Sequence, residues 1–302
     1  MFDMFETIAE QSSGEESYQS SVSGDVFVIS VGGSLIINDG GPDYAKINQI
    51  AGTLSSLHSS GKKIAIVVGG GKTARNYVDA LRSFNANNFE LDLLGIKVTR
   101  LNASLLISVM ESAHNEVLTN IPDAKAIIDS GKIPVFGGLL PFFTTDAVGA
   151  LLAEYLGASF INLTNVDGVY DANPSEFPDA KRFESLSYRQ LISLISPYGS
   201  SPGQNVVLDL ACCMILERSK IPAVVLDGNN AGNLSNYLNG YSFTGTVISS
   251  SDNPGFEIPQ VGEREEGGHE EEEGPKRAPA RRKRTKRSRE GSDEINPDEI
   301  DF

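Results

Sequence analysis

Residues 67–75, Val-Val-Gly-Gly-Gly-Lys-Thr-Ala-Arg, decide the predicted fold of this chain. They continue an apolar, mostly β-branched run that starts at residue 64 and is typical of a strand in a buried parallel sheet. After the three glycines, a helical pattern runs from Lys72 to about Phe84, with two cations in its first turn. Cations oppose the dipole at a helix N-terminus, where an anion is favoured. Glycines let backbone N–H groups approach such an anion, so we interpret the stretch as a phosphate-binding turn.

Three other interpretations of this turn were weighed. A Walker A loop is excluded, because Ile66 stands where that motif requires its first glycine. A dinucleotide-binding fingerprint needs an acid about twenty residues later, at the end of a second strand. Its glycine positions and the acids Glu90 and Asp92 are present, but residues 91–96 have helical spacing. A plain strand-to-helix turn with a solvated lysine stays open.

Charge and apolar content divide the 302 residues into three segments, in a chain of net charge −15. Residues 25–252 hold 15 basic and 21 acidic side chains and most of the apolar residues. We therefore expect one globular domain over residues 25–250, with an extension over 1–24 and a charged tail over 251–302, both disordered. Residues 276–289 contain nine basic side chains and no acid. We favour a solvated appendage there over nucleic-acid binding, because no aromatic residues are interleaved for base stacking.

Cysteine and histidine usage predicts no metal site built from protein side chains. Cys212 and Cys213 are adjacent and read best as small buried hydrophobes, and the three histidines are scattered along the chain. We find no signal peptide at the N-terminus and no apolar run approaching the ~20 residues of a membrane span. We expect a soluble, cytoplasmic protein with no membrane partner.

Apolar runs and helical spacing alternate along the central segment. Strands are predicted at 26–31, 64–68, 133–136, 160–163, 223–226 and 246–248, and helices around 47–57, 72–84, 89–113, 145–156, 188–195, 206–219 and 234–238. This alternation predicts an α/β fold, a three-layer α/β/α sandwich with a mainly parallel central sheet. Glycine pairs follow three of the strands, at 32–33, 69–70 and 137–138. Ligands of such sheets bind outside the carboxyl ends of the strands, so we expect these turns to meet around a nucleotide or other phosphorylated ligand.

Several polar residues in this pattern have a structural alternative. Thr145 or Asp146 can cap the helix that ends at Leu156, or can hydrogen-bond a phosphorylated substrate at that helix start. The 89–113 helix carries the polar residues Asp92, Lys97, Arg100 and Asn102. We interpret most of these four as a solvated face.

Five motifs in order resemble the amino-acid kinase superfamily, and within it the uridylate (UMP) kinases of the archaeal type. They are Gly32-Gly33-Ser34, residues 69–72 with Arg75, residues 144–147, residues 164–170, and Gly245-Thr246. The resemblance implies an acceptor-binding half over about 25–150 and an ATP-binding half over about 151–250. It also implies transfer of the ATP γ-phosphoryl group to UMP, with Mg²⁺, to give UDP and ADP. The family's hexamers further imply a homo-oligomer.

The resemblance assigns roles to individual residues of this sequence. The residues expected in catalysis are Lys72 as the transition-state cation, Arg75 as a phosphate clamp and Asp146 as the organiser of the site. Those expected to bind ATP are Gly33, Ser34, Gly71, Arg75, Thr164, Asn165, Tyr170 and Asn173. Those expected to bind UMP are Gly70, Asp92, Leu139, Leu140, Pro141, Phe142, Phe143, Thr144 and Thr145.

The sequence also departs from the family pattern. Ser30 stands where many superfamily members carry lysine, the 139–145 loop is apolar, and Asn173 precedes Pro174 where aspartate is usual. Two alternatives to a UMP kinase therefore stay open. One is a nucleotide- or oxyanion-binding paralogue without turnover, and the other is a kinase of another small acid or phosphate.

Overall fold

The computed structural model describes residues 26–196 and 207–254. The predicted extension over 1–24 and the basic run over 276–289 lie outside these residues. In the described part, eight strands form one sheet, in the order β5 (Ala113–Leu118), β6, β4, β1, β7, β9, β10 and β8.

The centre of the sheet is parallel, as predicted. β1 (Val26–Val31) pairs with β4 (Lys63–Val68) on one side and with β7 (Ser159–Thr164) on the other. β6 (Ile133–Phe136) and β9 (Ala223–Asp227) continue the parallel pairing outward. β10 (Thr246–Ser249) is antiparallel to β9, and the short β8 (Ser185–Ser187) is parallel to β10. The carboxyl ends of β1, β4, β6 and β7 therefore share one edge of the sheet.

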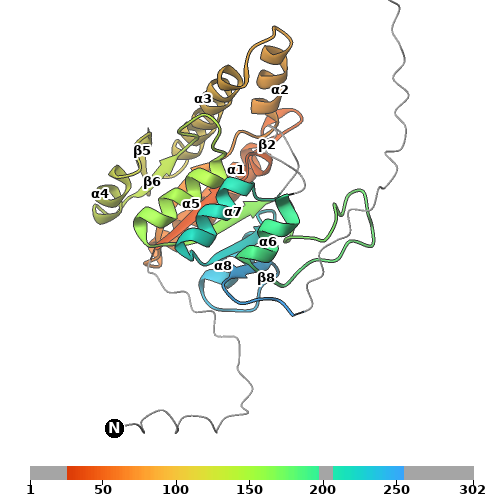
Figure 1. Cartoon of the computed structure of the whole chain (residues 1–302). Coiled ribbons are helices and arrows are strands. Elements are labelled where there is room, and N and C mark those ends of the chain that lie inside the picture. Colours follow the sequence, from red (N-terminus) through yellow and green to blue (C-terminus); the bar gives the residue numbers. More distant parts are fainter. Residues whose placement is uncertain (1–25, 197–206, 255–302) are drawn as a thin grey trace, which may run out of the picture. The chain divides into compact units, whose positions relative to one another are not determined.

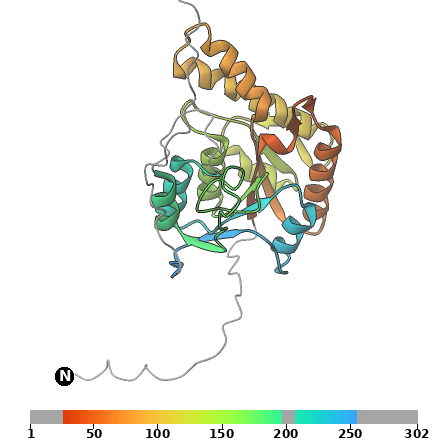
Figure 2. The same ribbon diagram turned by 90° about the vertical axis from the view of Figure 1, so that its right-hand side faces the viewer.

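Helices cover both faces of the sheet, so the predicted three-layer sandwich is confirmed. α1 (Tyr44–Ser59), α8 (Ala231–Leu238) and the end of α3 (Asn88–Ile107) pack on the face that Phe27, Ile29 and Val31 present. The opposite face, with Val28, is covered by α4 (Asp123–Asp129), α5 (Thr145–Leu156), α6 (Tyr188–Ile195) and α7 (Leu210–Ser219). Figure 2 shows α1 and α8 on one side of the sheet and α6 and α7 on the other. Successive side chains of β1 thus point to opposite faces of the sheet, and only those on the Val28 face can contact α5.

α2 (Gly71–Arg82) and α3 pack on each other and extend beyond the sheet (Figures 1 and 2). α2 buries no residue. Phe84, between the two helices, and Phe89, in the first turn of α3, are largely exposed. At the start of α2, a small hairpin of β2 (Ile37–Asn38) and β3 (Gly41–Pro42) follows the 3₁₀ turn η1 (Gly33–Leu35).

Three sequence predictions about element bounds and caps are corrected. The helix expected over 89–113 ends at Ile107, and β5 (Ala113–Leu118) follows it. β5 is an edge strand whose central residues are polar, so it lacks the apolar run of a buried strand. The helix expected from 206 begins at Leu210, because Asp209 is its N-cap. Thr144 caps α5, accepting from the Ala147 N–H at 3.1 Å, so Thr145 and Asp146 belong to its first turn.

No helix of residues 26–196 and 207–254 is long and apolar enough to cross a membrane.

Candidate active site

The glycine turns after β1 and β4 are in backbone contact. A Cβ on Gly71 would lie 2.6 Å from the Gly33 carbonyl oxygen, and a Cβ on Gly33 would lie 2.7 Å from the Gly71 Cα. The Gly71 φ is +60°, a left-handed conformation that favours glycine. Gly69 donates a hydrogen bond of 2.9 Å to the Val31 carbonyl. The two turns therefore form one unit at the sheet edge, as the sequence predicted.

The ends of β7 and β9 adjoin this unit. Gly32 donates to the Leu163 carbonyl at 2.8 Å, and Gly228 donates to the Thr164 carbonyl at 2.8 Å. A Cβ on Gly32 would lie 2.9 Å from the Leu163 oxygen. These contacts place the predicted ATP loop, which begins at Thr164, next to the glycine unit.

The third glycine pair, after β6, packs on α3. A Cβ on Gly137 would lie 2.8 Å from the Arg100 backbone nitrogen, so this turn packs directly on α3. Gly138 donates to Thr99 Oγ1 at 2.6 Å and accepts from Arg100 Nε at 3.0 Å. Asn102 of α3 is buried and donates to the carbonyls of Gly69 (2.9 Å) and Gly70 (3.1 Å). The solvated face expected for most polar residues of this helix does not include Asn102, which holds the glycine turn after β4.

Asp146, in the first turn of α5, lies against the centre of the sheet. Ser30 Oγ donates a hydrogen bond of 2.6 Å to Asp146 Oδ1. Ser30 is buried and alternates with Ile29 and Val31 along β1, so its side chain faces α5. Burial raises the pKa of Asp146 to about 7, the hydrogen bond from Ser30 opposes that shift, and the negative charge of Asp209 adds to it. Near neutral pH the carboxyl is therefore poised between its two protonation states.

Asp209 is a site residue that the sequence reasoning missed. It caps α7, accepting from the Cys212 N–H at 3.0 Å, and it also accepts a hydrogen bond from the Thr144 hydroxyl. Through Thr144 it connects α7 to the start of α5. An aspartate directly before an apolar helical run is a capping signal, and that signal would have located it.

The arrangement of glycine turns at one sheet edge agrees with the family to which the sequence is similar. The sequence profile of the Amino acid kinase family matches residues 25–227. This chain belongs to the amino acid kinase family.

Similar proteins within the family are named as uridylate kinases. One, from Methanocorpusculum labreanum, is 42% identical over 226 residues, covering 74% of this chain and 95% of that protein. Another, from Pyrococcus abyssi, is 41% identical over 223 residues, covering 73% of this chain and 98% of that protein. The crystal structure of uridylate kinase from Archaeoglobus fulgidus is 40% identical with a TM-score of 0.65, and the match covers 74% of this chain and 99% of that one. A UMP kinase structure from Bacillus anthracis has a TM-score of 0.65 at 22% identity over 75% of this chain and 96% of that one, a likeness of fold.

The predicted acceptor loop of this amino acid kinase family chain is held by α3. The Phe142 backbone N–H donates a hydrogen bond of 2.8 Å to Asp92 Oδ2. Phe142 has a φ of +75°, which is rare for a bulky residue, and its ring is largely exposed. The structure thus brings together Asp92 and the 139–145 loop, which the sequence had assigned to one ligand.

The predicted cations, Lys72 and Arg75, lie in the first part of α2. Lys72, in the first turn of α2, forms an ion pair with Asp39 in the turn between β2 and β3. Arg75, one turn further along, is exposed. Among the hydrogen bonds and ion pairs of the described residues, none joins Lys72 to Asp146 or Asn165.

The side chains of the predicted ATP residues make local contacts. Thr164 Oγ1 lies 3.3 Å from Asn165 Oδ1, and the Tyr170 hydroxyl donates to Asp167 at 2.6 Å, which raises the pKa of Tyr170. Asn173 donates to Glu176 Oε1 at 2.6 Å and accepts from the Ser175 N–H at 3.1 Å. Asn173 therefore structures its own turn. Ser34 is exposed in η1.

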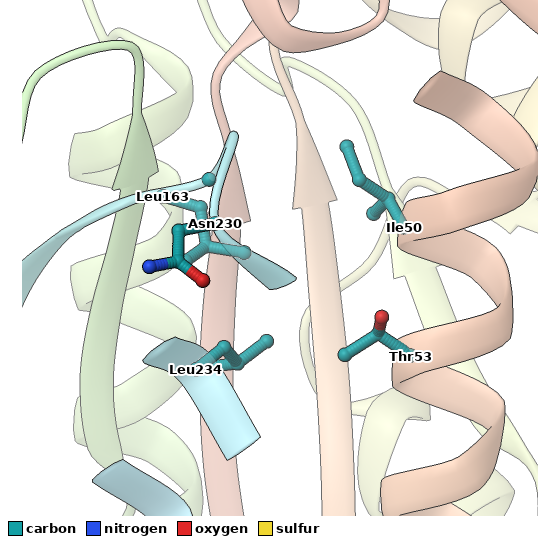
Figure 3. Close-up of a pocket in the computed structure, with 6 residues that line it drawn as sticks. Ile50, Thr53, Leu163, Asn230 and Leu234 are labelled. Atoms are coloured by element: carbon teal, nitrogen blue, oxygen red, sulfur yellow. The ribbon is translucent and has the colours of Figure 1, made fainter. Parts of the chain in front are cut away.

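A small apolar pocket is lined by residues of α1 and α8 (Figure 3). Its lining is Ile50, Thr53, Leu163, Gly228, Asn230 and Leu234. Ser30 and Asp146 lie on the opposite face of the sheet. No predicted site residue lines the pocket, so we assign it no part in the site.

Proposed function

We propose that this member of the amino acid kinase family transfers the γ-phosphoryl group of ATP to UMP, giving UDP and ADP. The observation that carries the proposal is the backbone contact between Gly33 and Gly71, at the edge where the Asp146 helix also begins. Glycine turns of this kind suit phosphate groups, and a parallel sheet binds its ligand at this edge. The choice of UMP rests on relatives near 40% identity that carry the name uridylate kinase.

The proposed donor and acceptor sites lie on the two halves of the sheet edge. The ATP phosphates would follow Gly33, Ser34, Gly71 and Arg75, with the nucleoside near Thr164, Asn165, Tyr170 and Asn173. UMP would occupy the side formed by Gly70, Asp92 and the loop of residues 139–145. The hydrogen bond between Asp92 and Phe142 supports this grouping, because it joins two acceptor segments that are far apart in sequence.

Phosphoryl transfer from ATP to UMP depends on positive charge and on the positioning of the substrates, and it requires no catalytic base. A UMP phosphate oxygen forms the new bond to the γ-phosphorus, and the bond from that phosphorus to the bridging oxygen of ADP breaks. The attacking oxygen is already ionised near neutral pH, and the transition state spreads negative charge over the equatorial oxygens. Lys72 and Arg75 are the cations proposed to meet that charge, which requires Lys72 to exchange Asp39 for phosphate. Removing one such charge would cost about 3–4 kcal/mol of barrier.

Mg²⁺ is the metal we propose to accompany ATP, where it neutralises phosphate charge. Oxygen ligands suit this ion, and the carboxyl group of Asp146 lies in the first turn of α5. The described residues contain no cluster of three or more His, Cys, Asp or Glu side chains able to hold a metal by themselves. We therefore propose that the ion is bound mainly through phosphate oxygens of ATP. Asp146 would assist it, in its proposed role as the organiser of the site.

The proposal is tested by offering the protein ATP and Mg²⁺ with a panel of acceptors, including UMP, CMP, AMP, carbamate and acetylglutamate. We expect ADP and UDP from UMP, at a rate far above that of every other acceptor. No UDP from UMP would overturn the proposal. Turnover of another acceptor in its place would establish the kinase of a small acid or phosphate.

A second candidate is a nucleotide-binding relative without turnover, and the local use of the Asn173 side chain favours it. Calorimetry with ATP separates the two. Under this second candidate ATP binds, no acceptor is phosphorylated, and Lys72→Ala leaves the background rate unchanged.

We also propose that the protein is a cytoplasmic homo-oligomer, with a hexamer as the form that the family resemblance favours. The outer side of α3 carries exposed apolar residues Phe89 (61% exposed), Leu93 (40%) and Leu101 (66%). Their spacing of four and eight residues gives one stripe along the helix. Sedimentation of the full chain tests this: we expect an oligomer, and Leu101→Glu should dissociate it. A monomeric full chain would contradict the proposal.

A further inference from the structure

The long connection between β7 and β8, residues 165–184, is fastened to the end of the sheet at one arginine. Arg182 forms an isolated antiparallel bridge with Tyr170. The Phe183 N–H donates to the Val169 carbonyl at 2.9 Å, and the Asp171 N–H donates to the Lys181 carbonyl at 3.1 Å. Residues 181–183 therefore run alongside residues 169–171 as a short ladder.

The Arg182 side chain ties three segments together. Its Nη1 donates to the Gly245 carbonyl, and its Nε lies 3.6 Å from Asp167 Oδ2. The other oxygen of Asp167, Oδ1, accepts from the Tyr170 hydroxyl at 2.6 Å. Asp167 thus contacts Arg182 with one oxygen and holds the Tyr170 ring with the other.

The backbone beneath this group is fixed by Thr246, which is fully buried. Its hydroxyl accepts from the Val169 N–H at 2.8 Å and donates to the Phe183 carbonyl at 2.6 Å. Gly168, with a φ of +156°, leaves the space that these groups need. A Cβ there would lie 2.5 Å from Thr246 Oγ1 and 2.8 Å from the Arg182 Cδ. Gly168 and Thr246 thus let the Arg182 stem lie directly against the loop.

We propose that Arg182 is a positioning residue for ATP, acting through Asp167 to set the orientation of Tyr170 and the shape of the loop of residues 164–170. The inference rests on the proposed function, which places Tyr170 at the donor nucleoside. Arg182 itself touches the loop and the Gly245 carbonyl, and its side chain is 23% exposed. Its guanidinium uses two nitrogens that point in different directions, a geometry that a lysine ammonium cannot reproduce.

This role predicts that loss of the Arg182 side chain weakens the binding of ATP and leaves the binding of UMP unchanged. In Arg182→Ala we expect the KM for ATP to rise about tenfold, while the KM for UMP and kcat change by less than about twofold. Arg182→Lys should recover part of the loss, because it keeps the charge near Asp167 but not both contacts. Asp167→Asn should raise the KM for ATP as well, and the double variant should be no worse than Arg182→Ala alone, since both act through one connection.

The matched control is Arg189→Ala, in the same half of the chain. Arg189 is 89% exposed, and its Nε lies 3.4 Å from Glu217 Oε1. We expect wild-type KM values for both substrates. A role in stability alone would lower the melting temperature of Arg182→Ala without changing the KM for ATP of the folded protein.

Calorimetry with ATP, without acceptor, separates this inference from the proposed function. If wild type phosphorylates no acceptor but binds ATP, the proposed reaction fails, and weaker ATP binding by Arg182→Ala still supports the positioning role. Equal ATP affinity in wild type and Arg182→Ala, or an equal rise in both KM values, overturns that role. If Arg182→Ala does not fold, Arg182→Lys and Asp167→Asn decide by the same measurements.

Discussion

Ser30 Oγ lies 2.6 Å from Asp146 Oδ1 and links the central strand β1 to the first turn of α5. The hydrogen bond favours the ionised carboxylate, whereas burial and the charge of Asp209 favour the protonated form, and the resulting pKa of Asp146 is about 7. The protonation state of the proposed organiser of the site therefore depends first on burial, and then on the opposing effects of Ser30 and Asp209.

Replacing Ser30 by alanine should shift the pH dependence of catalysis. The change removes a hydrogen bond that lowers the pKa of Asp146, so that pKa should rise further. We expect kcat/KM to increase with pH as Asp146 ionises, and the rising limb to move to higher pH in Ser30→Ala. Ser159→Ala is the control, because Ser159 is a buried serine whose Oγ has no partner among the described residues. Coincident profiles of Ser30→Ala and wild type would refute this.

Asp146→Asn should make the protein more stable at alkaline pH while impairing catalysis. The folded-state pKa of about 7 is above the ordinary value of 3.8, so the contribution of this carboxyl to stability is complete below about pH 4 and is lost as pH rises through 7. Asparagine does not titrate. We expect the variant to gain about 2–4 kcal/mol relative to wild type between pH 4 and pH 8. Urea unfolding across this range measures the difference, and a pH-independent difference would rule the prediction out.

Gly71→Ala should disrupt the glycine unit. The new Cβ would lie 2.6 Å from the Gly33 carbonyl oxygen, and the φ of +60° is unfavourable for alanine. We expect a loss of about 2–4 kcal/mol of stability and most of the activity. Gly157→Ala has the same φ of +60° with nothing within 4 Å of its Cβ, so it should lose only about 1–2 kcal/mol and stay active. Equal effects from both variants would show that the Gly33 contact is unimportant.

Asp39→Asn and Lys72→Ala should act in opposite directions. The ion pair between Lys72 and Asp39 is exposed to solvent, so Asp39→Asn should have little effect on stability. It frees the ammonium for phosphate, and we expect kcat/KM to stay at the wild-type level or rise. Lys72→Ala should lower kcat by about 10²–10³. Steady-state kinetics with UMP measures both effects. A Lys72→Ala variant with wild-type kcat would show that Lys72 has no catalytic role.

Asp92→Ala should loosen the acceptor loop. The variant loses the acceptor for the Phe142 N–H and leaves the φ of +75° at Phe142 without that support. We expect the KM for UMP to rise by about tenfold or more, with faster proteolysis between residues 139 and 145. Lys97→Ala, an exposed change on the same helix, is the control. Unchanged KM and unchanged proteolysis would contradict the proposed hold on the loop.

The parallel sheet was predictable because buried parallel strands carry continuous apolar runs. Residues 26–31 and 64–68 have such runs, and the glycines after them indicate where backbone segments approach closely. β5 was not predictable in this way, because it is an edge strand with a polar centre.

Two long-range contacts of the proposed site could not be predicted from the sequence. Ser30 and Asp146 are 116 residues apart, and Arg182 and Gly245 are 63 apart. Neither pair belongs to a local pattern, so only the packed sheet brings them together. Lys72 likewise was read as facing phosphate, and its pairing with Asp39 depends on a short hairpin without a strong sequence signal.

The contact between Gly33 and Gly71 leaves no room for either turn to shift without the other, since even one added carbon would collide. The two turns that we propose to hold the transferred phosphoryl group must therefore move together. Adaptation to a new acceptor or donor must then arise in the neighbouring loops, residues 139–145 and 164–173. One family can thereby diversify its substrates while the reaction centre keeps a single shape.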